Sequence, residues 1–137
     1  MGNGFIVKCN SCGYEDDVLL GIGMSFPSQV KDLIKQIKDG EYGAMARDRL
    51  KALEVLPAES QFDYFFDNLK NEFFYCKKCK TATVKPFFKL YDFIPEYKCP
   101  NCNSIMHKSN PDRVKFHRCP ECGKIEKLEY VYIINWD

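Results

Sequence analysis

The chain has 137 residues, of which 45% are hydrophobic and 28% charged, and its formal net charge is +1. These values predict one globular domain or two small ones and exclude a chain that is disordered throughout. No apolar run approaches the ~18 residues of a membrane span, and the first residues lack the pattern of a secretory signal. We therefore expect a cytoplasmic protein without a membrane partner.

The first part of the chain predicts a β-hairpin followed by two helices. Residues 5–20 contain two strand-like runs joined by a Cys-x-x-Cys turn, in which Gly13 supplies the backbone freedom that a tight turn needs. The next segment is helical by its periodicity, begins near Pro27 and ends at Gly40. Its apolar stripe consists of Val30, Leu33, Ile34 and Ile37. A second helix is expected over residues 41–55.

Residues 58–98, in the middle of the chain, combine helical and strand-like patterns. Residues 58–75 combine a helical stripe of phenylalanines with a strand-like end at residues 72–75. Residues 80–98 are rich in β-branched and aromatic side chains, so we expect two short strands there, broken by Pro86 and Pro95.

The last forty residues predict strands alone. Residues 104–108 form one strand, residues 109–112 a turn and residues 113–118 a returning strand, which together make a hairpin. Residues 127–136 form a closing strand with alternating apolar residues.

Cysteine is the most informative residue type. All eight cysteines fall in four Cys-x-x-Cys pairs: Cys9/Cys12, Cys76/Cys79, Cys99/Cys102 and Cys119/Cys122. Without a secretory signal we expect a reducing compartment, which favours metal binding over disulfides. Two residues between two cysteines let both thiolates reach one ion, and two such knuckles complete a closed tetrahedral site of the structural zinc type. The sequence therefore predicts two zinc ions and no catalytic position on either.

Two pairings of the four knuckles are compatible with the spacing. In the pairing that we favour, Cys99/Cys102 joins Cys119/Cys122 across 16 residues, because residues 104–118 resemble a hairpin, and Cys9/Cys12 joins Cys76/Cys79. In the other pairing Cys76/Cys79 joins Cys99/Cys102 across 19 residues, which also lies in the expected window. The first knuckle and the last would then be partners.

These elements predict an α+β fold with two four-cysteine zinc ribbons made of small antiparallel sheets. With the favoured pairing, residues 1–95 form a zinc ribbon that is interrupted by a helical insertion of about residues 25–70. Residues 96–137 form a second, C-terminal zinc ribbon.

Charge is divided unevenly along the chain. Residues 1–75 have a net charge of −4 and residues 76–137 a net charge of +5. The basic side chains of the second part, interleaved with aromatic residues, are candidates for contact with single-stranded RNA or DNA. These candidates are Lys77, Lys78, Lys85, Lys89, Arg113, Lys115 and Arg118. The acidic N-terminal part would repel a phosphate backbone, so a protein partner is favoured over nucleic acid.

No arrangement of acid, base and nucleophile is apparent, and no small-molecule substrate is indicated. His107 and His117 lie between Cys102 and Cys119, but four thiolates already close each site. We therefore expect a non-enzymatic zinc-binding adaptor or regulatory module. The alternatives are a single-stranded nucleic-acid-binding zinc ribbon, and a redox protein with an iron site or a thiol switch.

Three resemblances accompany this interpretation. The segments Cys99-Pro-Asn-Cys102 and Cys119-Pro-Glu-Cys122-Gly123 resemble the knuckles of zinc-ribbon proteins, a family that serves transcription, translation and protein assembly. The segments Cys9–Tyr14 and Cys119–Gly123 also look like the knuckles of rubredoxins, which implies a redox iron. Residues 8–14, 20–27 and 39–43 resemble a group of small uncharacterised bacterial proteins with paired knuckles, which implies zinc and a bacterial or phage setting.

Overall fold

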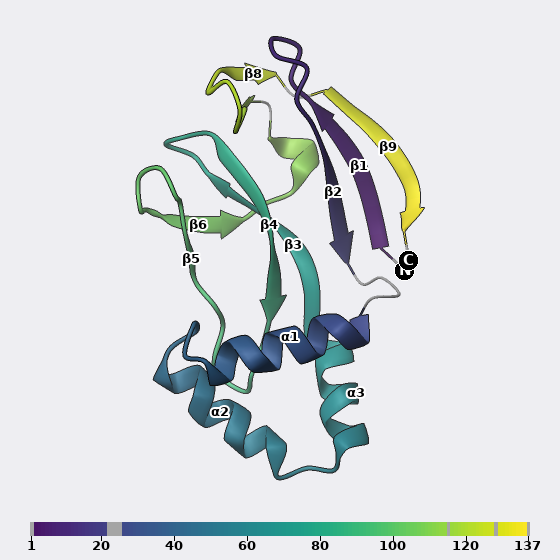
Figure 1. Ribbon diagram of the computed structural model, residues 1–137, viewed down its shortest axis with the longest axis vertical. Coiled ribbons are helices and arrows are strands. Elements are labelled where there is room, and N and C mark those ends of the chain that lie inside the picture. The colour runs from purple at the N-terminus through teal and green to yellow at the C-terminus, as the bar shows by residue number, and fades with distance from the viewer. Residues whose placement is uncertain (1, 22–25, 115, 128, 137) are drawn as a thin grey trace. The chain divides into compact units, whose positions relative to one another are not determined.

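The computed structural model describes residues 2–21, 26–114, 116–127 and 129–136 (Figure 1). The chain has a mixed α+β fold, as the sequence predicts, and divides into two compact units. Unit 1 comprises residues 1–21, 71–85 and 96–136, and unit 2 comprises residues 22–70 and 86–95. Among the described residues, no helix is long and apolar enough to cross a membrane.

Unit 2 contains the helices α1 (Phe26–Lys38), α2 (Ala44–Glu54) and α3 (Ala58–Asn68). The apolar stripe predicted for the first helix is confirmed, because Val30, Leu33 and Ile37 are buried while Ile34 is half-buried. Gly40 follows α1 with a φ of 88°, which is the left-handed backbone of a helix end. The core of unit 2 is made by Phe26, Val30, Leu33, Ile37, Ala46, Leu50, Leu53, Phe65, Leu69, Phe88 and Leu90.

Unit 1 is built on antiparallel strands. The hairpin predicted over residues 5–20 is present as β1 (Gly2–Lys8) and β2 (Glu15–Gly21), with Phe5 opposite Val18. The closing strand β9 (Glu129–Trp136) pairs with the other edge of β1, so the two ends of the chain lie side by side in one sheet (Figure 1). The apolar cluster beneath this sheet contains Phe5, Val7, Val18, Phe73 and Tyr75.

The remaining strands of the described residues lie between β2 and β9 in the sequence. They are β3 (Leu69–Cys76), β4 (Thr81–Phe88), β5 (Tyr97–Lys98), β6 (Ile105–Lys108), β7 (Phe116–Arg118) and β8 (Ile125–Lys127). One sheet has the order β5-β6-β3-β2-β1-β9, with β4 paired to β3, and β7 pairs with β8 in a separate sheet. The two strands predicted over residues 80–98 are present as β4 and β5, but Pro86 lies inside β4 and does not break it, contrary to the prediction. Its missing N–H is tolerated because β4 has β3 as its one partner in the described sheets.

The hairpin predicted over residues 104–118 is wrong. β6 pairs with β5 and, through Phe74↔Lys108 and Tyr75↔His107, with β3. β7 pairs with β8, and a short 3₁₀ helix (Pro111–Arg113) separates β6 from β7. The first predicted strand is present as β6, and only the end of the second is present as β7; each pairs with a strand other than the predicted one.

Candidate metal centres

Each Cys-x-x-Cys knuckle forms the turn of one hairpin. The four turns lie between β1 and β2, β3 and β4, β5 and β6, and β7 and β8. In the first turn the Cys9 N–H donates to the Tyr14 carbonyl at 2.8 Å, and the Gly13 N–H donates to the Cys9 carbonyl at 3.0 Å. The same two bonds recur around Cys99 and Cys119 at 2.8–2.9 Å. The knuckles are therefore one local structure repeated along the chain.

The residue after the second cysteine has a left-handed backbone in all four knuckles. The φ angles are 78° at Gly13, 59° at Lys80, 60° at Asn103 and 74° at Gly123. Glycine adopts this conformation freely and asparagine tolerates it, whereas lysine is strained by its Cβ. The sequence indicates this requirement at Gly13, but a lysine gives no such signal, so Lys80 could not be predicted in this role.

The hairpin turns bring the eight cysteines together in two groups of four, each of which could hold a metal ion. Site 1 consists of Cys9, Cys12, Cys119 and Cys122, and site 2 consists of Cys76, Cys79, Cys99 and Cys102. In each group the four sulfur atoms lie within 4.8 Å of one another.

The sulfur spacing fits a tetrahedral ion. Within site 1 the Cys9 and Cys122 sulfurs are 3.7 Å apart and the Cys12 and Cys119 sulfurs 3.5 Å apart. Within site 2 the Cys76 and Cys102 sulfurs are separated by 3.6 Å. A metal–sulfur bond of about 2.3 Å in a tetrahedron places its sulfurs about 3.8 Å apart. Both donor sets are therefore close to the geometry that one divalent ion requires.

The favoured pairing of the knuckles is wrong, and the other pairing is present. Site 1 joins the first knuckle to the last, and site 2 joins the two middle ones. The reason is that β6 pairs with β3, which brings Cys99/Cys102 to Cys76/Cys79, while the strands that flank the last knuckle, β7 and β8, pair with each other in the described sheets. The expected division of the chain near residue 95 depended on the pairing that the structure does not show.

The thiols of site 2 differ in the direction of their pKa shifts. Hydrogen bonds from the side chain and backbone of Ser104 lower the pKa of Cys102 to about 6. The side-chain hydrogen bond with Cys102 raises the pKa of Cys79 to about 12, and burial is the second cause. Several thiolates at this separation repel one another, so the group ionises completely only when a cation neutralises it.

The thiols of site 1 show the same division. Burial raises the pKa of Cys119, but the backbone N–H groups of Cys122 and Glu121 outweigh it and lower the pKa to about 7. The Tyr14 N–H lowers the pKa of Cys12, but burial and the neighbouring thiols outweigh it and raise the pKa to about 12. Ligand sets of this kind are completed by metal binding.

Arg118 connects the surroundings of the two sites. Its Nε donates to the carbonyl of the site 2 ligand Cys79 at 2.8 Å, and its Nη1 donates to the carbonyl of Gly123, beside site 1, at 3.2 Å. Its backbone N–H also donates to the Lys80 carbonyl at 2.7 Å. The sequence singled out Arg118 as a nucleic-acid contact and gave no signal of this connecting role.

The other described candidates for nucleic-acid contact are divided between the two units. Lys77, Lys78, Lys85 and Arg113 are exposed side chains of unit 1, whereas Lys89 is an exposed side chain of unit 2. Lys115 lies outside the described residues. His107 is exposed on β6, and His117 is half-buried; neither belongs to a metal-binding group among the described residues.

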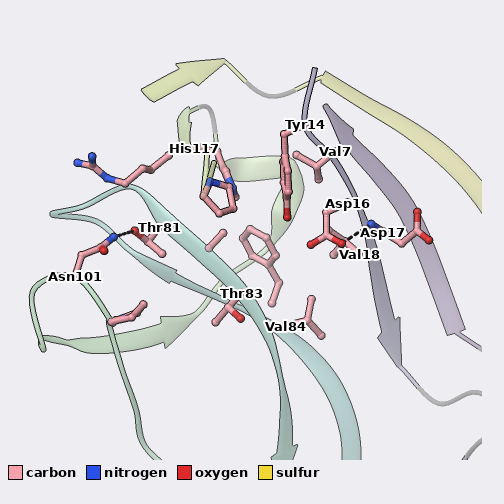
Figure 2. Close-up of a pocket in the computed structure, with 15 residues that line it drawn as sticks. Val7, Tyr14, Asp16, Asp17, Val18, Thr81, Thr83, Val84, Asn101 and His117 are labelled. Carbon is pink, nitrogen blue, oxygen red and sulfur yellow. Dashed lines mark hydrogen bonds between the residues drawn. The ribbon is translucent and has the colours of Figure 1, made fainter. Parts of the chain in front are cut away.

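A cleft of about 500 Å³ lies in unit 1, beside the knuckle turns (Figure 2). We call it the β2–β4 cleft. It is lined by Val7, Tyr14, Asp16, Asp17, Val18, Phe73, Thr81, Ala82, Thr83, Val84, Pro100, Asn101, His117, Arg118 and Pro120. The His117 Nδ1 atom is buried at its edge without a hydrogen-bond partner among the described residues. The sequence did not predict this cleft.

Comparisons of the chain with protein-family models, curated proteins and solved structures found no significant match.

Proposed function

We propose that this protein is a non-enzymatic adaptor that binds two zinc ions and recognises another protein. The observation that carries the proposal is the pair of four-cysteine groups with sulfur separations of 3.5–3.7 Å. Four thiolates around one ion leave no position for water or a substrate, which is the arrangement of structural zinc rather than of catalytic zinc. The zinc ions would fix the four hairpin turns of unit 1.

The charge of the zinc-loaded unit supports a protein partner over nucleic acid. Unit 1 contains twelve basic and nine acidic side chains, a net charge of +3. Each four-thiolate zinc site contributes a charge of −2, so the loaded unit carries a net charge of −1. Nucleic-acid binding depends on an excess of cations along the phosphate backbone, which this unit does not offer.

The basic candidates themselves add to this argument. The guanidinium of Arg118 already donates to two backbone carbonyls, so it is not a free phosphate ligand. Lys89 belongs to unit 2 rather than to the unit that contains the knuckles. Lys77, Lys78 and Lys85 have exposed side chains, which are ordinary features of a solvated surface.

Native mass spectrometry of the full chain, purified from its own host without chelator, tests the proposal. We expect two zinc ions per chain and an additional protein bound to the loaded species, whose release follows removal of zinc by a chelator. A nuclease-sensitive adduct in place of a protein would reverse the ranking of partners. Iron in either site, with the visible absorption of an iron–thiolate centre, would replace the adaptor by a redox protein.

A further inference from the structure

We propose that the β2–β4 cleft binds an extended segment of the protein partner, with a lysine or arginine side chain that pairs with Asp16. This inference rests on the proposed function, because it names the surface on which the adaptor would hold its partner. Four observations carry it: the origin of the cleft, the nature of its walls, the position of Asp16 and the lack of a cation for this carboxylate among the described residues.

The cleft exists because two strands separate. β2 meets β3 at the pair Gly21↔Asn71, and from there toward Glu15 the two strands move apart (Figure 1). The apolar side chains that line the opening include Val7, Val18 and Phe73, which belong to the core cluster of unit 1. The floor of the cleft is therefore an apolar surface that a partner side chain could cover.

Strand backbones form the walls. Residues 16–18 of β2 and residues 81–84 of β4 all line the cleft, although the side chains of successive strand residues point to opposite faces. Lining by consecutive residues means that the main chain itself borders the opening. β4 pairs with β3 alone in the described sheets, so it is an edge strand. An extended peptide is the ligand whose main-chain groups match such a border.

Asp16 occupies a position where the pattern calls for an apolar side chain. It lies opposite Val7 in the β1–β2 ladder, on the same face as Val18, and both valines are buried. Figure 2 shows its carboxylate turned toward the cleft and toward Tyr14, whose pKa is raised by burial and by the charge of Asp16. The Asp16 side chain is exposed, so its carboxylate is in contact with water beside this apolar floor.

A partner that covers the cleft must therefore supply a cation. No ion pair among the described residues involves Asp16, whose Oδ1 accepts a hydrogen bond from the Asp17 N–H at 2.9 Å. Arg118 also lines the cleft, but its guanidinium is bound to the carbonyls of Cys79 and Gly123. Closing water out without a lysine or arginine would leave a buried unpaired charge, which costs several kcal/mol.

The test uses the zinc-loaded full chain and three capped octapeptides that alternate valine with lysine, glutamate or serine. Binding is followed by the amide shifts of ¹⁵N-labelled protein. We expect the lysine peptide to shift the amides of residues 16–18 and 81–84 and to bind about tenfold more tightly than the other two. Shifts confined to other residues, or no binding of the lysine peptide at millimolar concentration, would overturn the assignment.

Two variants of β2 provide the matched comparison. Asp16→Lys should reduce the affinity for the lysine peptide about tenfold or more, and Asp17→Lys should reduce it less than about threefold. The two substitutions change the charge equally, but Asp17 lies opposite Ile6 on the other face of the strand. Equal losses of affinity in the two variants would mean that binding depends only on the overall charge of β2. Asp16 would then be a charged residue that prevents a strand edge from pairing with other chains, and not a partner of the peptide lysine. Asp16→Asn, of nearly equal shape, replaces Asp16→Lys if that variant fails to load two zinc ions.

The outcome also separates this inference from the proposed function. If the zinc-dependent protein adduct persists in Asp16→Lys, the adaptor function stands and the partner binds elsewhere. If wild-type protein forms no protein adduct, the adaptor function fails as well. If a decathymidine oligonucleotide shifts the cleft amides while the lysine peptide does not, the ligand is nucleic acid and the peptide assignment is wrong.

Discussion

Two variants that each lack four cysteines distinguish the two pairings of the knuckles. The first variant replaces the cysteines of site 1, Cys9, Cys12, Cys119 and Cys122, by serine. The second replaces Cys9, Cys12, Cys76 and Cys79, which takes two ligands from each site. Both keep four cysteines in two intact Cys-x-x-Cys pairs, so they are matched in number and in local spacing.

The structure predicts opposite metal contents for these variants. The first variant keeps all of site 2 and should bind one metal ion per chain, whereas the second keeps only half of each site and should bind none tightly. The other pairing predicts the reverse, none for the first variant and one for the second. The difference is large because a complete structural zinc site contributes about 10–16 kcal/mol of binding free energy, comparable to the whole stability of a small domain.

Native mass spectrometry gives the metal count, and the absorption of the cobalt-substituted protein reports the number of thiolate ligands. One metal in the second variant and none in the first would refute the grouping of the cysteines into site 1 and site 2. The cobalt spectrum keeps the test decisive if loss of site 1 unfolds part of unit 1, because the hairpins of site 2 are joined by the β3–β6 pairing and do not depend on β1 or β9.

Three further predictions concern single residues. Arg118→Met removes donors to two carbonyls beside the metal sites. It should lower the free energy of unfolding of the zinc-loaded protein by about 1–3 kcal/mol, measured by thermal denaturation. An unchanged unfolding transition would contradict the role of Arg118 in connecting the surroundings of the two sites. Gly13→Ala should lower the free energy of unfolding by about 1–2 kcal/mol and Lys80→Gly should raise it by about 1 kcal/mol in the same assay, because both positions have a left-handed backbone. An added Cβ at Gly13 meets no atom within 4 Å, so a steric clash does not contribute to the expected loss. Shifts of the same sign in the two variants would rule out backbone strain as the cause. Arg49 lowers the pKa of Asp92 by its hydrogen bonds and charge, so their ion pair stabilises the fold above the ordinary pKa of aspartate and is lost as the pH falls through the lowered value. In Arg49→Met the pKa of Asp92, followed by NMR titration, should therefore rise toward its ordinary value. An unmoved pKa would show that the pair is not formed in solution.

Local features of the fold could be predicted because they depend on neighbours in the sequence. The stripe at Val30, Leu33 and Ile37 is the periodicity of a helix with one buried face, and α1 has that face in the core of unit 2. The hairpin around Cys9 and Cys12 follows from two short apolar runs and a tight turn. In each case the residues that decide the structure lie within about twenty positions of one another.

The metal sites could be predicted only in part. The sequence by itself determined that all eight cysteines are potential ligands and that they act in pairs, because the Cys-x-x-Cys spacing fixes two sulfurs in one local turn. It did not determine which turns are partners, since separations of 16 and 19 residues both suit a zinc ribbon. Two residue pairs between β3 and β6, far apart in the sequence, decided this in favour of site 2.

The same distinction applies to the binding surface. The acidic run at residues 15–17 resembles a solvated turn when only the sequence is considered; its three side chains are exposed in the structure, but the residues belong to strand β2. The register of β1 and β2 places the exposed Asp16 opposite Val7, on the face of β2 that also carries Val18, and the separation of β2 from β3 opens the cleft beside it. Alternation along a strand is a property of the local sequence, but which face becomes the wall of a cleft depends on where distant strands pair and where they part.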